Sequence, residues 1–333
     1  MIRNNLTTLI SANRFFWLLL VGFALFPVLT TIMDQPFWND LAMRIMLLGI
    51  AALGLNLILG FGGMVSFGHA AWIGIGAYCV VVAQAYGIDN GWLHLVIALA
   101  AAAVLGLVIG LLSLRTSGLY FIMITLAFAQ MLFFFFVGLE RFGGDDGVVI
   151  DRAEFPPFDI YAPLTLYFLI WGVLLVVSVL LMLLTRSRFG IVLQGLKDNA
   201  ARIEAMGLSP LKFRSAGFVI SAMIGASAGV MFANWQEFVS PDLMHWSRSG
   251  ELLIIVVLGG MTRLPGPLVG AIVFLLLEET LPEVMHLMAP SIADNWMLIF
   301  GPLLVLVVLF APGGVLGLVA RLQQLLKGRG GAA

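Results

Sequence analysis

Residues 60–78 read Gly60-Phe-Gly-Gly-Met-Val-Ser-Phe-Gly-His-Ala-Ala-Trp-Ile-Gly-Ile-Gly-Ala-Tyr78, and long apolar runs lie on both sides of them. Small residues let helices approach closely in lipid, where packing rather than hydrophobicity drives association. The many glycines between Gly60 and Gly76 indicate an irregular backbone in addition to ordinary helix packing. We expect a broken or re-entrant start to a membrane span here. The triplet Gly62-Gly63-Met64 recurs as Gly259-Gly260-Met261, a weak trace of an internal repeat.

The composition of the whole chain agrees with a membrane location. Of the 333 residues, 61% are hydrophobic and only 11% are charged, whereas a soluble domain carries roughly 25% charged residues. This balance excludes a soluble enzyme, a disordered chain and a nucleic-acid binder. The sequence predicts an all-α, polytopic membrane bundle in a single domain, 1–333, with room for about eight to ten transmembrane helices.

Hydropathy places most of these spans directly. A long apolar stretch at 251–281 is interrupted by Thr262-Arg-Leu-Pro-Gly-Pro267, and proline stops a helix. This stretch could form two short helices, or one hairpin that enters and leaves the membrane on the same face. The other candidate spans lie at about 15–33, 41–61, 64–86, 93–113, 118–138, 164–184, 213–236 and 296–318.

The charges predict the orientation of the chain. Segment 185–214 holds six of the 17 basic residues, and further basic residues lie near both chain ends, while the loops 34–40 and 145–159 are acidic. Basic loops remain in the cytoplasm. We therefore expect segment 185–214, the N-terminus and the tail 319–333 to be cytoplasmic, and the acidic loops to face outward. Six predicted spans separate the N-terminus from segment 185–214, and an even number of crossings places both on the same side of the membrane, as this orientation requires.

Segment 185–214 is also the longest polar stretch between spans. Its apolar and polar residues follow helical spacing, and Gly207 followed by Pro210 marks a helix end. Two short amphipathic helices on the cytoplasmic face fit this pattern. The segment could be a mere connector between spans, or it could be a docking surface for a cytoplasmic partner.

Few residues within the spans could take part in chemistry. Polar side chains inside a bilayer are costly and tend to face the bundle interior, where they bond neighbouring helices or contact a solute. The candidates for a translocation path are Asn56, Ser66, His69, Thr125 and Gln130. The four histidines are too dispersed to predict a metal site, and no arrangement of nucleophile and base predicts an enzyme.

Charged residues near the spans have ordinary interpretations. Arg44 is expected to extend its head to an interface or to pair there. Glu278 and Glu279 lie late in their span and are expected at the interface. The single cysteine, Cys79, rules out an internal disulfide and is expected to be a small core residue.

Five blocks, in order along residues 45–318, resemble one transport family. The chain is similar to the LivM-type permeases of branched-chain amino acid ABC importers. This family often has glycine where Thr262 stands here and arginine where Gly313 stands. The blocks are 60–78; 114–128; Gly143-Gly-Asp-Asp-Gly147; Arg186-Ser-Arg-Phe-Gly190 through Glu204-Ala-Met-Gly207; and Gly259-Gly-Met261 with Gly266-Pro-Leu-Val-Gly-Ala271.

The resemblance implies a non-catalytic subunit of a larger machine in the bacterial inner membrane. A second permease subunit, two cytoplasmic ATPases and a periplasmic solute-binding protein would be its partners, with no cofactor in this chain. The sequence contains no Gly-Lys dipeptide and hence no phosphate-binding P-loop, so ATP would be bound by the partners. The resemblance also implies that segment 185–214 docks on the ATPase, through Leu196, Asp198, Asn199, Arg202, Ile203, Glu204, Ala205 and Gly207.

Several solutes fit this class of machine. Leucine, isoleucine and valine are the first expectation, and urea, short amides or another small solute are the alternatives within the same class of machine. A secondary transporter working alone is a further alternative. Such a carrier would be expected to place acidic residues inside its spans, and the spans predicted here are nearly free of acids.

Overall fold

The computed structural model describes residues 14–33, 35–162, 164–288, 296–310 and 313–318, and its described part is almost wholly helical. Six of its helices are long and apolar enough to cross a membrane, which confirms the polytopic helical bundle. The long elements are α2 (Arg14–Met33), α3 (Pro36–Asn56), α5 (Gly91–Ser113), α6 (Leu119–Val137), α7 (Thr165–Arg186), α10 (Pro210–Gln236) and α12 (Gly266–Met288). The shorter elements are η1 (Leu57–Phe61), α4 (Ala70–Ala85), η2 (Glu140–Phe142), β1 (Val148–Val149), α8 (Arg188–Asp198), α9 (Ala200–Ala205), β2 (Phe238–Val239), η3 (Pro241–Met244), α11 (Trp246–Gly259) and α13 (Met297–Phe310).

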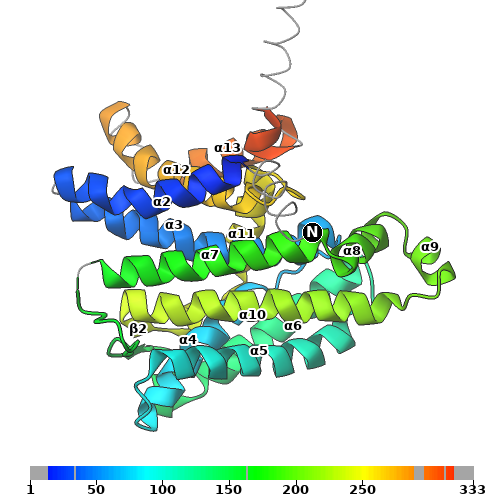
Figure 1. The fold of residues 1–333 in the computed structure, drawn as a ribbon, viewed down its shortest axis with the longest axis horizontal. Coiled ribbons are helices and arrows are strands. Elements are labelled where there is room, and N and C mark those ends of the chain that lie inside the picture. Colours follow the sequence, from blue (N-terminus) through cyan, green and yellow to red (C-terminus); the bar gives the residue numbers. More distant parts are fainter. Residues whose placement is uncertain (1–13, 34, 163, 289–295, 311–312, 319–333) are drawn as a thin grey trace, which may run out of the picture.

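Helices α3 and α10 form the centre of the bundle. The most apolar window of α3 is 83% buried and that of α10 is 72% buried, whereas the corresponding window of α6 is only 17% buried. Helix α10 packs on α3, α4 and α5, and α7 packs on α3 and is drawn between α3 and α10 in Figure 1. Helices α5 and α6 therefore present most of their surface outward, as apolar helices in contact with lipid or with another membrane protein do.

Helices α4 and α10 touch backbone to backbone through glycine. A side chain on Gly76 would collide with the carbonyl oxygen of Ala226, and one on Gly229 would collide with the carbonyl oxygen of Ile73. Close helix contact through small residues is the main packing device available inside a bilayer. The glycines of residues 60–76 therefore have two roles. Those before Ala70 accompany the break in the chain, and those within α4 allow close helix packing.

The chain breaks where the glycine-rich stretch predicts it. Helix α3 runs into η1, which is a π-helical turn, and the chain is then non-helical until α4 starts at Ala70. Gly63 turns the chain with a φ of +69°. Side chains from other elements bond the freed backbone groups: Thr125 Oγ1 accepts from Phe67 N–H at 3.3 Å, and Ser249 Oγ accepts from Ala70 N–H at 3.0 Å. Irregular backbone at membrane depth is tolerated only with such partners.

The long stretch 251–281 forms two helices, α11 and α12, which pack against each other around Gly259, Gly266 and Gly270. Helix α11 has 14 residues and α4 has 16, lengths of about 21 and 24 Å, less than the roughly 30 Å of a hydrocarbon core. Helix α4 starts inside the bundle, because His69 and Ala70 are fully buried, whereas α11 starts at Trp246, which is 47% exposed. The Ser249–Ala70 bond shows that they start beside each other.

The turn between α11 and α12 contains a strained residue. Thr262 has a φ of +67°, in the left-handed region that glycine adopts freely. This conformation costs about 1–2 kcal/mol for a residue with a side chain. The observation gives a physical reason for glycine at this position in similar sequences.

Thr262→Gly is therefore expected to stabilise the protein. Glycine loses more chain entropy on folding, which offsets part of the gain, so we expect a net gain of about 0.5–1 kcal/mol and a melting temperature higher by roughly 1–3 °C. Thermal unfolding of the detergent-purified protein measures it. Thr280→Gly, an exposed position within α12, serves as the control and should lower the melting temperature. Equal melting of the Thr262→Gly variant and the wild type would contradict the assigned strain.

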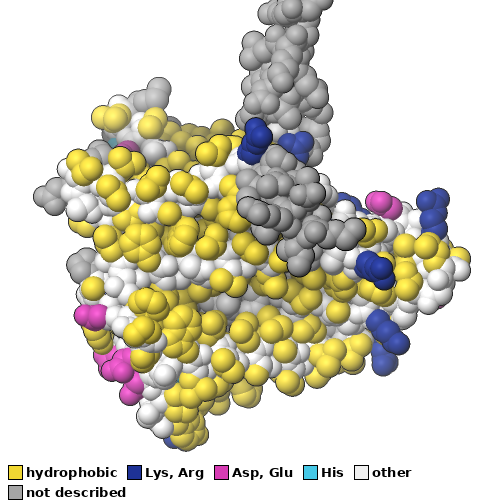
Figure 2. Space-filling view, viewed as in Figure 1, with side chains coloured by type: hydrophobic (Ala, Val, Ile, Leu, Met, Phe, Trp, Pro, Cys, Tyr) yellow, Lys and Arg dark blue, Asp and Glu magenta, His cyan; other side chains and the backbone are white. Residues whose placement is uncertain are grey.

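The two ends of the bundle carry opposite charge. Lysine and arginine gather at the end formed by α8 and α9, and aspartate and glutamate gather mainly at the opposite end, with an apolar belt between them (Figure 2). We call these the basic end and the acidic end. The acidic end contains the short β1–β2 ladder, in which Val148 pairs with Val239. The tail 319–333, expected to be cytoplasmic, lies outside the described residues.

Candidate functional site

Segment 185–214 folds into the two short helices that the sequence predicts, α8 and α9, at the basic end (Figure 1). Ser187 caps α8, because its Oγ accepts from Gly190 N–H at 3.3 Å. Asn199 ends α8 and caps α9, accepting from Arg202 N–H at 3.0 Å. Each helix thus begins with a side chain that bonds an otherwise unpaired backbone amide.

Gly207 ends α9 in the manner of a Schellman motif. Its N–H donates to Glu204 O at 2.9 Å, and Leu208 N–H donates to Ile203 O at 3.3 Å. Its φ of +82° suits glycine, although nothing stands within 4 Å of where a side chain would begin. The backbone conformation, rather than space, therefore requires glycine here.

The inner face of α8 packs on its own chain. Leu193 and Leu196 are fully buried, and the rings of Phe189 and Phe213 stack with centroids 5.8 Å apart. Leu196 was expected to anchor an ATPase, but it is only 1% exposed and faces the bundle. The amphipathic pattern that predicted an apolar anchor reflects packing of α8 on α10.

The remaining expected docking residues lie on or near the outer surface. Ile203 is half-buried, with its side chain close to Gly195 of α8. Two exposed apolar side chains, Ile191 and Met206, flank this polar surface. The arrangement offers carboxylate, amide and guanidinium groups beside apolar contacts, which suits a protein partner. The exposed members of the expected set are Asp198, Asn199, Arg202, Glu204, Ala205 and Gly207.

Lys197 links this segment to the break after α3, and sequence reasoning missed it. Its Nζ donates to Gly60 O at 2.8 Å, and its aliphatic stem lies against Gly63. A second bond ties α8 to the bundle, because Arg214 of α10 donates to Leu196 O at 3.3 Å. The partners of Lys197 lie more than 130 residues earlier in the chain, so no local pattern could have revealed the contact.

Three of the expected path residues surround the break. Ser66, His69 and Thr125 are buried, with Ser66 Oγ accepting from Gly68 N–H at 3.3 Å. Both ring nitrogens of His69 lack a hydrogen-bond partner. Gln130 lies more than a turn beyond Thr125 on α6, and its Nε2 is buried without a partner.

Asn56 joins the two interrupted regions of the chain. Its Nδ2 donates to Arg263 O at 3.3 Å, while its Oδ1 has no partner. Gly60 lies against Asn56 and against the backbone of Thr262. The break after α3, the turn between α11 and α12, and Lys197 of α8 therefore meet at one place. We call this meeting point, formed by Asn56, Gly60, Lys197 and Thr262, the junction.

A group of three charged side chains ties α3 to α12. Arg44 forms ion pairs with Glu278 at 3.0 Å and with Glu279 at 3.3 Å. These residues were expected separately at an interface, and the structure pairs them with each other. Among the described residues, no group of three or more His, Cys, Asp and Glu side chains is placed to hold a metal ion.

Most of the chain matches one known protein family. Residues 38–308 match the model of the family described as branched-chain amino acid transport system / permease component. The chain belongs to this family. The match includes the break after α3, α8 and α9, and the α11–α12 turn, so all parts of the junction lie within it.

Individual relatives agree with this membership. The chain is 28% identical to the high-affinity branched-chain amino acid transport system permease protein LivM of Escherichia coli K12, over 88% of this chain and 72% of the relative. It is 27% identical to LivM of Salmonella typhimurium, over 87% and 72%. It is 22% identical to LivH of Escherichia coli K12, over 80% and 90%. No solved structure matches the chain significantly.

Proposed function

We propose that this chain is the permease subunit of a binding-protein-dependent ABC importer that moves leucine, isoleucine and valine across the bacterial inner membrane. The observation that carries the proposal is the junction, where the exposed α8–α9 segment bonds through Lys197 to Gly60, in the π-helical turn that precedes the break. The names of the LivM and LivH relatives supply the solute class. In this proposal the basic end is cytoplasmic and the acidic end faces the periplasm.

The geometry suits transmission of a movement. Capping by Ser187 and Asn199, together with the stacking of Phe189 on Phe213, holds α8 and α9 as a firm unit on the bundle. Two partner ATPases that close on ATP would push on the outer face of this unit. Lys197 would pass the displacement to η1, a π-helical turn of the kind that often occurs at functional sites.

The path would run beside the break between α3 and α4. The backbone is irregular there, and Asn56, Ser66, His69 and Thr125 supply the buried polar groups. A solute with an aliphatic side chain needs few strong binding groups in the permease, so specificity can lie in the periplasmic binding protein. The chain itself would perform no covalent step and hold no cofactor. A second permease subunit would complete the pore.

One observation favours a second candidate, an ion-coupled carrier that works without partners. Arg44, Glu278 and Glu279 place two acids and one base within helices of the bundle, and intramembrane charges often mark ion pathways. Helices that start inside the bundle, as α4 does, are also found in such carriers. Against this candidate, Arg44 already neutralises much of the acidic charge.

The test is reconstitution of the chain in liposomes with the candidate sister permease, ATPases and binding protein. We expect leucine, isoleucine and valine to stimulate ATP hydrolysis. We also expect them to accumulate inside the liposomes only when ATP is supplied. A different stimulating solute, such as urea or a short amide, would overturn the solute assignment. Uptake by the chain alone, driven by an ion gradient without ATP, would establish the carrier instead.

A further inference from the structure

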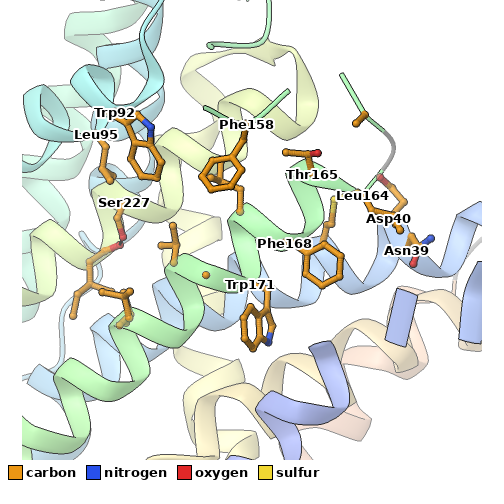
Figure 3. Close-up of a pocket in the computed structure, with 18 of the residues that line it drawn as sticks. Asn39, Asp40, Trp92, Leu95, Phe158, Leu164, Thr165, Phe168, Trp171 and Ser227 are labelled. Carbon is orange, nitrogen blue, oxygen red and sulfur yellow. Dashed lines mark hydrogen bonds between the residues drawn. The ribbon is translucent and has the colours of Figure 1, made fainter. Parts of the chain in front are cut away.

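A long groove of about 1760 Å³ opens between α3, α5, α7 and α10 (Figure 3). Its lining on α7 extends from Leu164 to Leu184, about 30 Å of helix, which matches the thickness of a hydrocarbon core. All four helices are long and apolar enough to span the membrane. The groove is therefore long enough to extend through the hydrocarbon core of a bilayer.

The walls of the groove are almost wholly apolar. Phe168, Trp171 and Val176 of α7 and Leu95 of α5 line it, and its described lining residues include no lysine, arginine or histidine. Polar groups gather at one end, where Figure 3 shows Asn39, Asp40 and Thr165 near one another. Trp92 and Phe158 also line the groove, as expected of aromatic residues at a membrane interface.

Among the described residues that line the groove, Asp40 carries the only ionisable side chain. It accepts one hydrogen bond, from Trp235 Nε1 at 2.7 Å, and forms no ion pair among the described residues. A single negative charge at the polar end of an apolar groove attracts an ammonium group and repels a purely anionic one.

We propose that this groove binds a phospholipid with a primary-amine headgroup, of the phosphatidylethanolamine type. Its acyl chains lie along α7 and its ammonium group contacts Asp40. A transmembrane helix of a partner fits less well, because helix contacts in membranes use small residues, whereas this lining is rich in leucine, phenylalanine and tryptophan. The proposal does not depend on the transported solute or on the partner subunits.

Gly172 provides a test of occupancy. It lines the groove on α7, and nothing stands within 4 Å of where its side chain would begin, so Gly172→Phe fills the groove without a backbone clash. Gly22 of α2 is equally unobstructed and does not line the groove, so Gly22→Phe is the matched control. Val176→Trp gives a second block, since Val176 is 66% exposed and lines the groove.

The full chain is purified from membranes that contain phosphatidylethanolamine, in mild detergent, and retained lipid is counted by native mass spectrometry. We expect one tightly held lipid on the wild type and on Gly22→Phe, and its loss from Gly172→Phe and Val176→Trp. Retention by both blocked variants, or equal loss from Gly22→Phe, would overturn the proposal. Loss of a co-purifying second permease rather than a lipid would also overturn it, and would assign the groove to a protein.

The headgroup is tested separately with added phosphatidylethanolamine and phosphatidylglycerol. The wild type should prefer phosphatidylethanolamine by roughly threefold, as expected of an exposed ion pair. Asp40→Asn should keep the bound lipid and lose this preference. An unchanged preference in Asp40→Asn, or a preference of the wild type for phosphatidylglycerol, would overturn the assigned headgroup.

Discussion

Gly229→Leu is expected to abolish the folded protein. The first side-chain atom at this position would collide with the carbonyl oxygen of Ile73 and stand 3.0 Å from the amide nitrogen of Ala77. Both neighbours are backbone atoms of α4, so no side chain can move aside. Overpacking of a core costs about 1–3 kcal/mol even where side chains can adjust, and here α4 and α10 would have to separate.

The measurement is the yield of monodisperse protein in size-exclusion chromatography, together with its melting temperature. Gly301→Leu is the matched control, because Gly301 lies within α13 and nothing stands within 4 Å of its side-chain direction. We expect wild-type behaviour from Gly301→Leu and aggregated or absent protein from Gly229→Leu. Normal yield and melting of Gly229→Leu would show that α4 and α10 are not in close contact.

Lys197→Met is expected to separate ATP hydrolysis from transport. The change keeps the aliphatic stem beside Gly63 and removes only the charged bond from Nζ to Gly60 O. Hydrogen bonds to charged groups contribute about 1.5–3 kcal/mol, so transport should fall roughly tenfold or more. ATP hydrolysis by the assembled transporter should continue, because the outer face of α8–α9 is unchanged.

Transport and ATP hydrolysis are measured together on the same reconstituted vesicles. Lys212→Met is the control, since Lys212 is an exposed lysine near the same end of the bundle, at the start of α10, and its loss should alter neither rate. Equal reduction of both rates in Lys197→Met would indicate lost assembly. Unchanged transport would remove Lys197 from the coupling route.

The sequence predicts the elements of this fold that rest on local signals. Apolar length marks the spans, glycine marks the break after α3, and the Gly207–Pro210 pair marks the end of α9. The stretch 251–281 stayed ambiguous, because a proline-containing turn looks the same in a hairpin and between separate helices. The structure shows α11 and α12 packed through glycine.

The contacts that build the candidate site are not local. Ser249 caps α4 from 179 residues further along the chain, and Arg44 meets Glu278 across 234 residues. A single sequence gives no signal for such pairs. The burial of Leu196 shows what a local pattern leaves undecided. Helical periodicity identifies an apolar face, but it does not say whether the same chain or a partner protein covers that face.

The most direct measurement is site-specific crosslinking from α9 to the partner ATPase. A Glu204→Cys variant, with Cys79→Ala to remove the native thiol, would carry a thiol-linked photocrosslinker on the exposed docking face. The matched variant is Asp145→Cys, exposed in the acidic loop that precedes β1. We predict a crosslink to the ATPase from position 204 and none from position 145. A crosslink from position 145, or none from position 204 in an assembled transporter, would contradict docking through α8–α9.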